Sequence, residues 1–186
     1  QAVIELLEEY PQPALACLMN ILSTHDTPRI LNRLGADFIP PRAYQADNYL
    51  SDAQREKGLR LLKKAALLQF SLPGIPCIFY GDEAGMEGYG DPYCRGTFPW
   101  GREDQTLLHY YRRLGALRGQ YRPDFAGSCV FLDYEGGRLI FDRGERIRLA
   151  MNFSPAAFEV EGEPLLAEGA RAGGLEPGGY GWFLKK

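Results

Sequence analysis

Two short apolar runs in this sequence are each followed by side chains that could do chemistry. His25 and Asp26 follow a run that ends in "NILST", and Asp82 and Glu83 follow the apolar residues Cys77 to Tyr80. Histidine exchanges protons near neutral pH, and a carboxylate accepts hydrogen bonds. If both runs are parallel strands, these polar groups lie together at the carboxyl ends of the strands, where βα loops build functional sites.

Taken alone, the His25–Asp26 pair has two other readings. A histidine beside an aspartate can bind a metal, but the second histidine, His109, falls in a predicted helix, and too few ligands remain for a metal site. Asp26 could instead cap a helix that starts at Thr27 and Pro28. The dipeptide alone favours this structural reading, and we expect no metal and no cofactor.

Residues 1–122 alternate between predicted helices and apolar strands. The segment "SDAQREKGLRLLKKAALLQFSLPG" is the clearest helix, because Ser51 and Gln54 form a capping-box pattern at its start. The apolar strand from Cys77 to Tyr80 follows directly, an order typical of a parallel βα unit. Upstream, "ALACLMNILS" predicts a helical start with a strand from about Leu18, and "TPRILNRLGAD" predicts a short helix.

Residues 123–186 have a different character. Three strand-like runs are separated by "EGG" and "RGE", which are hairpin-turn signals, and short glycine-rich segments follow. This pattern predicts a small antiparallel β domain of the sandwich type. The chain is therefore expected to divide into an α/β part at 1–122 and a β part at 123–186.

Composition narrows the class of protein. Hydrophobic content of 45%, aromatic content of 12% and a net charge of −3 describe a globular protein without the basic clusters of nucleic-acid binders. The four cysteines match no zinc pattern, and Cys17 and Cys77 are expected to be buried free thiols, which suits a reducing compartment. No apolar run is long enough to span a membrane. Gln1 opens partway through an amphipathic helix, so we expect a fragment of a longer protein.

Three motifs in order carry a resemblance to a known family. "LSTHDTPRIL", "LPGIPCIFYGDEAGMEG" and "DPYCRGTFPW" resemble segments of the alpha-amylase superfamily, glycoside hydrolase family 13. The first is similar to the region at the end of barrel strand seven, and the second to strand eight with its loop. The third is most similar to the cyclomaltodextrinase, neopullulanase and maltogenic amylase group, although Thr24 stands where many members have Asn. The resemblance implies the last βα units of a TIM (β/α)8 barrel, strands seven and eight with their helices, followed by a small antiparallel β-sandwich domain.

The resemblance also implies roles for individual residues. Members of this family cleave glycosidic bonds with retention, through a nucleophilic Asp and an acid/base Glu at the ends of strands four and five. Asp26 matches a third carboxylate that grips sugar hydroxyls and stabilises the transition state, and His25 would donate a hydrogen bond to the same sugar. Asp91 and Arg95 match positions of the strand-eight loop that contact sugar, although an ion pair within the loop is an equally good reading. The nucleophile and the acid/base are expected upstream of Gln1, so this chain alone should be inactive.

Other residues of these segments are expected to support the site. Asp82 and Glu83 should brace the rim by hydrogen bonding, and Arg29 should belong to the rim structure. Tyr80 and Trp100, together with Phe98, could stack on sugar or simply pack, and packing is favoured for Trp100.

The expected enzyme is an α-glucan hydrolase of the bacterial cytoplasm, acting on α-1,4 or α-1,6 bonds of maltodextrins, cyclodextrins or pullulan. Its expected partners are that substrate, the rest of the parent barrel and a second copy in a homodimer, with no nucleic acid and no membrane. A non-catalytic, amylase-like scaffold or partner subunit stays open as an alternative, although the presence of His25 and Asp26 favours the enzyme. A carbohydrate-binding β module built on Tyr134, Tyr180 and Trp182 ranks last, because these aromatics form no obvious platform in sequence.

Overall fold

The computed structural model describes residues 2–171 and 173–185 of the chain. These residues form two compact units, which are described separately. The α/β unit comprises Met19–Phe70 and Pro76–Leu117, and the sheet unit comprises the described parts of Gln1–Leu18, Ser71–Ile75 and Arg118–Lys186. No helix among the described residues has the length and apolar character that crossing a membrane requires.

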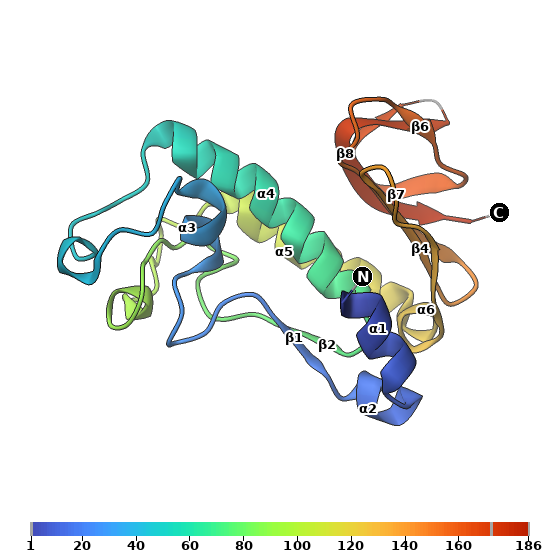
Figure 1. Ribbon diagram of the computed structural model, residues 1–186, viewed down its shortest axis with the longest axis horizontal. Helices are drawn as coiled ribbons and strands as arrows, with labels where there is room; N and C mark the ends of the chain where they lie inside the picture. Colours follow the sequence, from blue (N-terminus) through green and yellow to red (C-terminus); the bar gives the residue numbers. More distant parts are fainter. Residues whose placement is uncertain (1, 172, 186) are drawn as a thin grey trace. The chain divides into compact units, whose positions relative to one another are not determined.

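Helices account for most of the regular structure before residue 127 (Figure 1). They are α1 (Ala2–Glu9), α2 (Gln12–Ala16), α3 (Ile30–Gly35), α4 (Asp52–Ser71), α5 (Gln105–Gln120) and α6 (Arg122–Ala126), with the 3-10 turns η1 (Arg42–Tyr44) and η2 (Tyr93–Arg95). The strands are β1 (Met19–Ile21), β2 (Ile75–Cys77), β3 (Cys129–Asp133), β4 (Arg138–Arg143), β5 (Ile147–Asn152), β6 (Phe158–Glu159), β7 (Glu163–Arg171) and β8 (Gly174–Leu184).

The long helix α4 begins at the predicted capping box. The Gln54 backbone N–H donates to Ser51 Oγ at 3.3 Å, and the Ser51 backbone N–H donates to Gln54 Oε1 at 3.1 Å, so two otherwise unsatisfied donors are paired. Helix α5 lies alongside α4 (Figure 1). Tyr110 on α5 donates its hydroxyl hydrogen to the Lys63 carbonyl on α4 at 3.1 Å. The two helices supply much of the apolar core of the α/β unit, including the fully buried Leu62 and Leu114.

Helix α3 approaches α4 at a glycine contact. A Cβ atom on Gly58 would lie 2.8 Å from Leu31 Cδ1 and 3.2 Å from the Cα of Gly35. A Cβ atom on Gly35 would lie 2.5 Å from the Gln54 carbonyl oxygen. The absence of side chains at both positions therefore lets the two helix backbones come close together.

Strands β1 and β2 pair with each other and are short. The expected helix-to-strand change near Leu18 is confirmed, because α2 is followed by β1. The expected strand over Cys77 to Tyr80 is wrong in its bounds, since β2 ends at Cys77. Beyond the end of β2, the carbonyl of Tyr80 accepts a hydrogen bond from Arg29 Nη1 at 2.8 Å.

The sheet unit contains one curled antiparallel sheet. Its strand order is β3-β4-β5-β8-β6, with β7 also paired to β8. The hairpins predicted at "EGG" and "RGE" join β3 to β4 and β4 to β5. Gly137 and Gly144 in these turns have φ of 79° and 56°, which other residues rarely adopt. The predicted antiparallel β character of this region is confirmed. Its inner cluster includes Ala150, Leu175 and Phe183.

Arg143 holds together several segments of the sheet unit. Its side chain is 1% exposed and donates to four backbone carbonyls, those of Ser71 at 2.7 Å, Ser128 at 3.2 Å, Gly127 at 3.3 Å and Phe125. The indole N–H of Trp182 donates to Ser71 Oγ at 2.6 Å. Buried donors and acceptors are thus satisfied between β4, β8 and Ser71, the last residue of α4.

Candidate active site

The turn after β1 carries the predicted pair. His25 Nε2 lies 3.1 Å from Asp26 Oδ2, and the two side chains are 66% and 71% exposed. Both groups are therefore open to solvent and adjacent, as an arrangement that grips a ligand requires. The alternative in which Asp26 caps the next helix is not what the structure shows, because α3 begins at Ile30 with Arg29 at its N-cap position.

Threonine hydroxyls fix the backbone of this turn. The backbone N–H of Thr24 donates to Thr27 Oγ1 at 3.1 Å, and the backbone N–H of Asp26 donates to Thr24 Oγ1 at 3.2 Å. Thr24 is the residue that departs from the Asn of many family members. Its hydroxyl accepts a local backbone hydrogen bond of the kind that Asn side chains also accept in turns.

A buried ion pair lies behind the turn. Arg29 and Asp82 are 0% and 3% exposed in their side chains, and Arg29 Nη1 donates to Asp82 Oδ1 at 3.1 Å. The Arg29 guanidinium also lies 4.7 Å from the ring centre of Phe79 and 4.9 Å from that of Tyr80. The prediction that Asp82 supports its surroundings by hydrogen bonding is confirmed by this contact, and Arg29 is the partner that it holds.

The pKa of Asp82 reflects this setting. Burial raises the pKa of Asp82 from 3.8 to about 6, while a hydrogen bond with Ser23 and the neighbouring Arg29 act to lower it. Ser23 is itself 0% exposed and accepts the backbone N–H of Ile30 at 2.8 Å. At neutral pH the Asp82 carboxylate is ionised and paired with Arg29.

Asp91 and Arg95 form an ion pair within the loop between β2 and α5. Arg95 Nη2 contacts Asp91 Oδ1, and the side chains are 46% and 40% exposed. This ion pair within the loop is one of the two alternatives that the sequence left open for Asp91 and Arg95. Both side chains are also partly exposed, so a ligand can reach them. Among nearby residues, Glu83 Oε2 accepts the backbone N–H of Gly81 at 2.9 Å, as expected for a residue that braces the loop.

The aromatic residues of the loop were expected either to stack on sugar or to pack against other side chains. Tyr80 donates its hydroxyl to the Gly96 carbonyl at 2.8 Å and is 42% exposed. Trp100 is 82% exposed, although its ring centre lies 4.6 Å from that of Phe98. Trp100 therefore packs against Phe98, as favoured from the sequence, while most of its indole faces solvent.

Sequence reasoning missed several polar residues that hold the rim together. Gln69 on α4 donates to the carbonyls of Asn20 at 2.8 Å and Cys77 at 2.9 Å, so one amide bridges both short strands. Asn32 accepts the backbone N–H of Gly88 at 2.7 Å. The only signal in the sequence was a polar residue inside an apolar helical run, as in "ALLQFSL".

The cysteines also differ from expectation. Cys17 is exposed, which contradicts its predicted burial, and Cys77 is half-buried. Cys94, on which no prediction was made, is 0% exposed and donates its thiol hydrogen to the His25 carbonyl at 3.0 Å. The described cysteines are free thiols.

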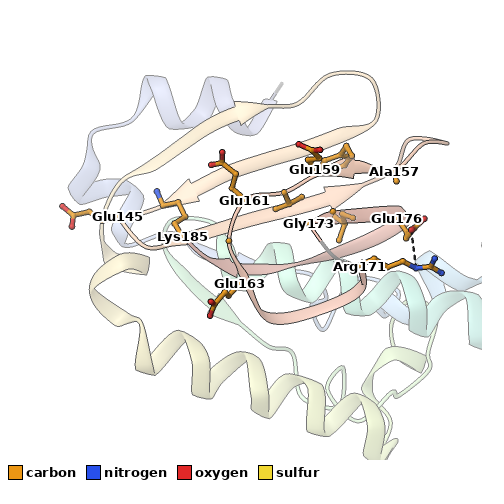
Figure 2. A pocket seen from close by; sticks show the side chains of 14 residues that line it. Glu145, Ala157, Glu159, Glu161, Glu163, Arg171, Gly173, Glu176 and Lys185 are labelled. Carbon is orange, nitrogen blue, oxygen red and sulfur yellow. Dashed lines mark ion pairs between the residues drawn. The ribbon is translucent and has the colours of Figure 1, made fainter.

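A separate cleft lies in the sheet unit. It has a volume of about 1200 Å³, and Glu159, Glu161, Glu163 and Glu176 are among its lining residues (Figure 2). No group of His, Cys, Asp or Glu within the described part of the chain could hold a metal ion. Tyr180 and Trp182 are 3% and 1% exposed, so they cannot form the platform that a carbohydrate-binding β module would need.

Comparison with known proteins shows the superfamily to which the chain belongs. No family model matches the chain. The chain is 40% identical over 143 residues to an amylopullulanase from Thermoanaerobacter thermohydrosulfuricus, covering 77% of this chain and 9% of that protein. It is 33% identical over 165 residues to a cyclomaltodextrinase from Geobacillus thermopakistaniensis (strain MAS1), covering 85% of this chain and 24% of that protein. The type III pullulan hydrolase from Thermococcus kodakarensis matches with a TM-score of 0.73 and 28% identity, over 94% of this chain and 30% of that one. The chain belongs to the alpha-amylase superfamily.

Membership of the alpha-amylase superfamily confirms the predicted fold class. The structural neighbours are TIM-barrel enzymes with a C-terminal domain, and the curled antiparallel sheet of this chain is consistent with such a domain. The motif pattern pointed to the cyclomaltodextrinase group, whereas the amylopullulanase match has the higher identity, 40% against 33%. This superfamily chain spans 9% and 24% of the length of those two curated relatives.

Proposed function

We propose that this chain supplies the end of the catalytic barrel, residues 1–122, and the C-terminal β domain, residues 123–186, of an α-glucan hydrolase. The enzyme would cleave α-1,4 or α-1,6 glucosidic bonds of maltodextrins, cyclodextrins or pullulan with retention. The observation that carries the proposal is the exposed His25–Asp26 pair, 3.1 Å apart, in the turn after β1. The names of the relatives, amylopullulanase and cyclomaltodextrinase, support the class of substrate.

Asp26 is proposed to stabilise the transition state. Its carboxylate can accept hydrogen bonds from two neighbouring sugar hydroxyls and so hold a distorted glucosyl ring. A fixed negative charge also stabilises the positive charge that develops in an oxocarbenium-like transition state. Because the threonine hydroxyls already fix the turn, this charge needs little reorganisation when substrate binds.

His25 is proposed to donate a hydrogen bond to the same sugar. Its imidazole is 66% exposed and stands beside Asp26, so one ring nitrogen can contact the carboxylate while the other faces a ligand. The nucleophile and the acid/base would come from other segments of the longer enzyme. We place Asp91 and Arg95 at the donor side, where their ion pair would open toward sugar hydroxyls.

The rest of a longer protein is the proposed partner of the short strands. Met19, Ile21 and Ile75 on β1 and β2 are 64%, 46% and 58% exposed, which is unusual for apolar strand residues. Neighbouring barrel strands would cover them and pair their open edges. A homodimer and a location in the bacterial cytoplasm complete the proposal, the latter supported by the free thiols.

The decisive experiment is Asp26→Asn in the full-length enzyme that contains this chain. We expect kcat on a cyclodextrin to fall by about 100-fold or more, because a preorganised charge in an active site contributes about 3 kcal/mol. The control is Asp52→Asn, an exposed carboxylate at the start of α4 that should leave kcat unchanged. Equal turnover by Asp26→Asn and wild type would refute the assignment.

A second arm uses the 186-residue chain by itself. It should release no glucose or maltose from cyclodextrin, starch or pullulan, because the proposed nucleophile and acid/base lie elsewhere. An inactive full-length protein with normal folding would favour the scaffold alternative.

A further inference from the structure

The peptide unit between His25 and Asp26 is held at both of its polar ends. Its N–H, on Asp26, donates to Thr24 Oγ1 at 3.2 Å, and its carbonyl, on His25, accepts the Cys94 thiol hydrogen at 3.0 Å. A peptide unit is planar, so fixing both ends fixes its orientation. That orientation sets the directions in which the His25 and Asp26 side chains leave the backbone.

The thiol is suited to this contact. Cys94 is 0% exposed, so water does not compete for its hydrogen-bond partner. Burial raises the pKa of the Cys94 thiol, which keeps it protonated at neutral pH and preserves the S–H donor.

The turn that carries Cys94 is itself pressed against a fixed glycine. A Cβ atom on Gly88 would lie 2.4 Å from the Tyr93 carbonyl oxygen and 2.8 Å from the Cys94 Cα. The backbone N–H of Gly88 donates to Asn32 Oδ1 at 2.7 Å, and its carbonyl accepts the Arg29 N–H at 2.8 Å. The thiol therefore projects from a backbone that cannot withdraw without breaking these contacts.

We propose that Cys94 is a positioning residue that locks the His25–Asp26 peptide and couples it to the Asp91–Arg95 loop. Cys94 is the neighbour of Arg95 in η2, so the same short turn carries one sugar-binding candidate and fixes the other pair. The inference rests on the proposed function, because it deepens the roles assigned to these residues. A hydrogen bond from a buried thiol thus acts together with the threonine hydroxyls to set the geometry of the site.

The test is a crossed pair of substitutions in the full-length enzyme. Cys94→Ser keeps a donor but reduces volume, whereas Cys94→Val keeps volume but removes the donor; Cys94→Ala removes the donor without added bulk if the valine variant fails to fold. The matched control is Cys17→Ser, at an exposed cysteine. Loss of one hydrogen bond predicts a fall in kcat of about five- to tenfold for Val and Ala, with KM changed less than about twofold. Cys94→Ser should recover most of that loss.

A second readout does not need activity. In protein labelled with ¹³C in histidine, the His25 resonance is assigned by its loss in His25→Gln. The resonance should move in Cys94→Val and Cys94→Ala but return near its original position in Cys94→Ser. If Val matches wild type in kcat and in the His25 resonance, or if Ser is impaired as much as Val, the inference is overturned and packing explains the residue. Absence of glucan hydrolysis by the wild type would refute the proposed function, while the His25 resonance would still decide the role of Cys94.

Discussion

The raised pKa of Asp82 makes a specific prediction about stability and pH. The carboxyl is 3% exposed and burial raises its pKa from 3.8 to about 6. The folded protein therefore binds the Asp82 proton more tightly than the unfolded chain does. The free energy of unfolding should fall as pH rises from about 4 to about 6 and then level off, because above the folded pKa both states are ionised at this site.

The magnitude follows from the two pKa values. Their difference corresponds to about 3 kcal/mol between the fully protonated and fully ionised limits. For a single site with these values, the part gained on going from about pH 7.5 to about pH 5 is about 1.4 kcal/mol. Asp124 and Asp142 act in the opposite sense and at lower pH, since the partners Arg146 and Arg148 hold their pKa values below 3.8.

The assay is urea unfolding, followed by circular dichroism, at about pH 5 and about pH 7.5. Asp82→Asn should remove the increase in the free energy of unfolding at the lower pH. The substitution also changes the stability at both pH values, because Arg29 loses its anionic partner, but this change does not affect the comparison between the two pH values. Asp52→Asn, at an exposed carboxylate, should keep the wild-type gain. An unchanged gain in Asp82→Asn would show that the Asp82 pKa is not raised in the folded protein.

Two further pairs of substitutions, one pair in each unit, test the packing by urea unfolding. Gly58→Ala should destabilise by about 1–2 kcal/mol, because the strain of a Cβ atom 2.8 Å from Leu31 Cδ1 exceeds the gain in helix propensity. Gly115→Ala in α5, where a Cβ atom meets nothing within 4 Å, should instead stabilise by about 0.5–1 kcal/mol; destabilisation at both glycines would contradict the steric reason. Arg143→Met should cost about 3 kcal/mol or more, because it removes the guanidinium donor from the buried carbonyls of Ser71 and Phe125. Arg138→Met, at a half-exposed ion pair with Asp133, should cost less than about 1 kcal/mol, and similar losses for the two arginines would show that burial does not set the cost.

Local sequence determined the elements whose signals lie within a few residues. The reciprocal hydrogen bonds of Ser51 and Gln54 start α4 where the capping box predicts, since both partners lie in one helical turn. The glycines of the two hairpin turns likewise predict β3, β4 and β5, because a turn conformation with positive φ is a property of the turn residues themselves. The ordered motifs around His25 and Asp82 were sufficient to predict the superfamily.

Tertiary structure decided the contacts that link residues far apart in the sequence. Arg29 and Asp82 are 53 positions apart, and Cys94 and His25 are 69 apart, yet each pair is in hydrogen-bond contact. Nothing in the local pattern around Cys94 distinguishes a buried donor from the exposed thiol that Cys17 proved to be. Strand length was also not set by local sequence, because the apolar run continues to Tyr80 whereas β2 ends at Cys77. The physical reason is common to these cases: burial and hydrogen-bond partners depend on which surfaces meet, and only the folded chain brings those surfaces together.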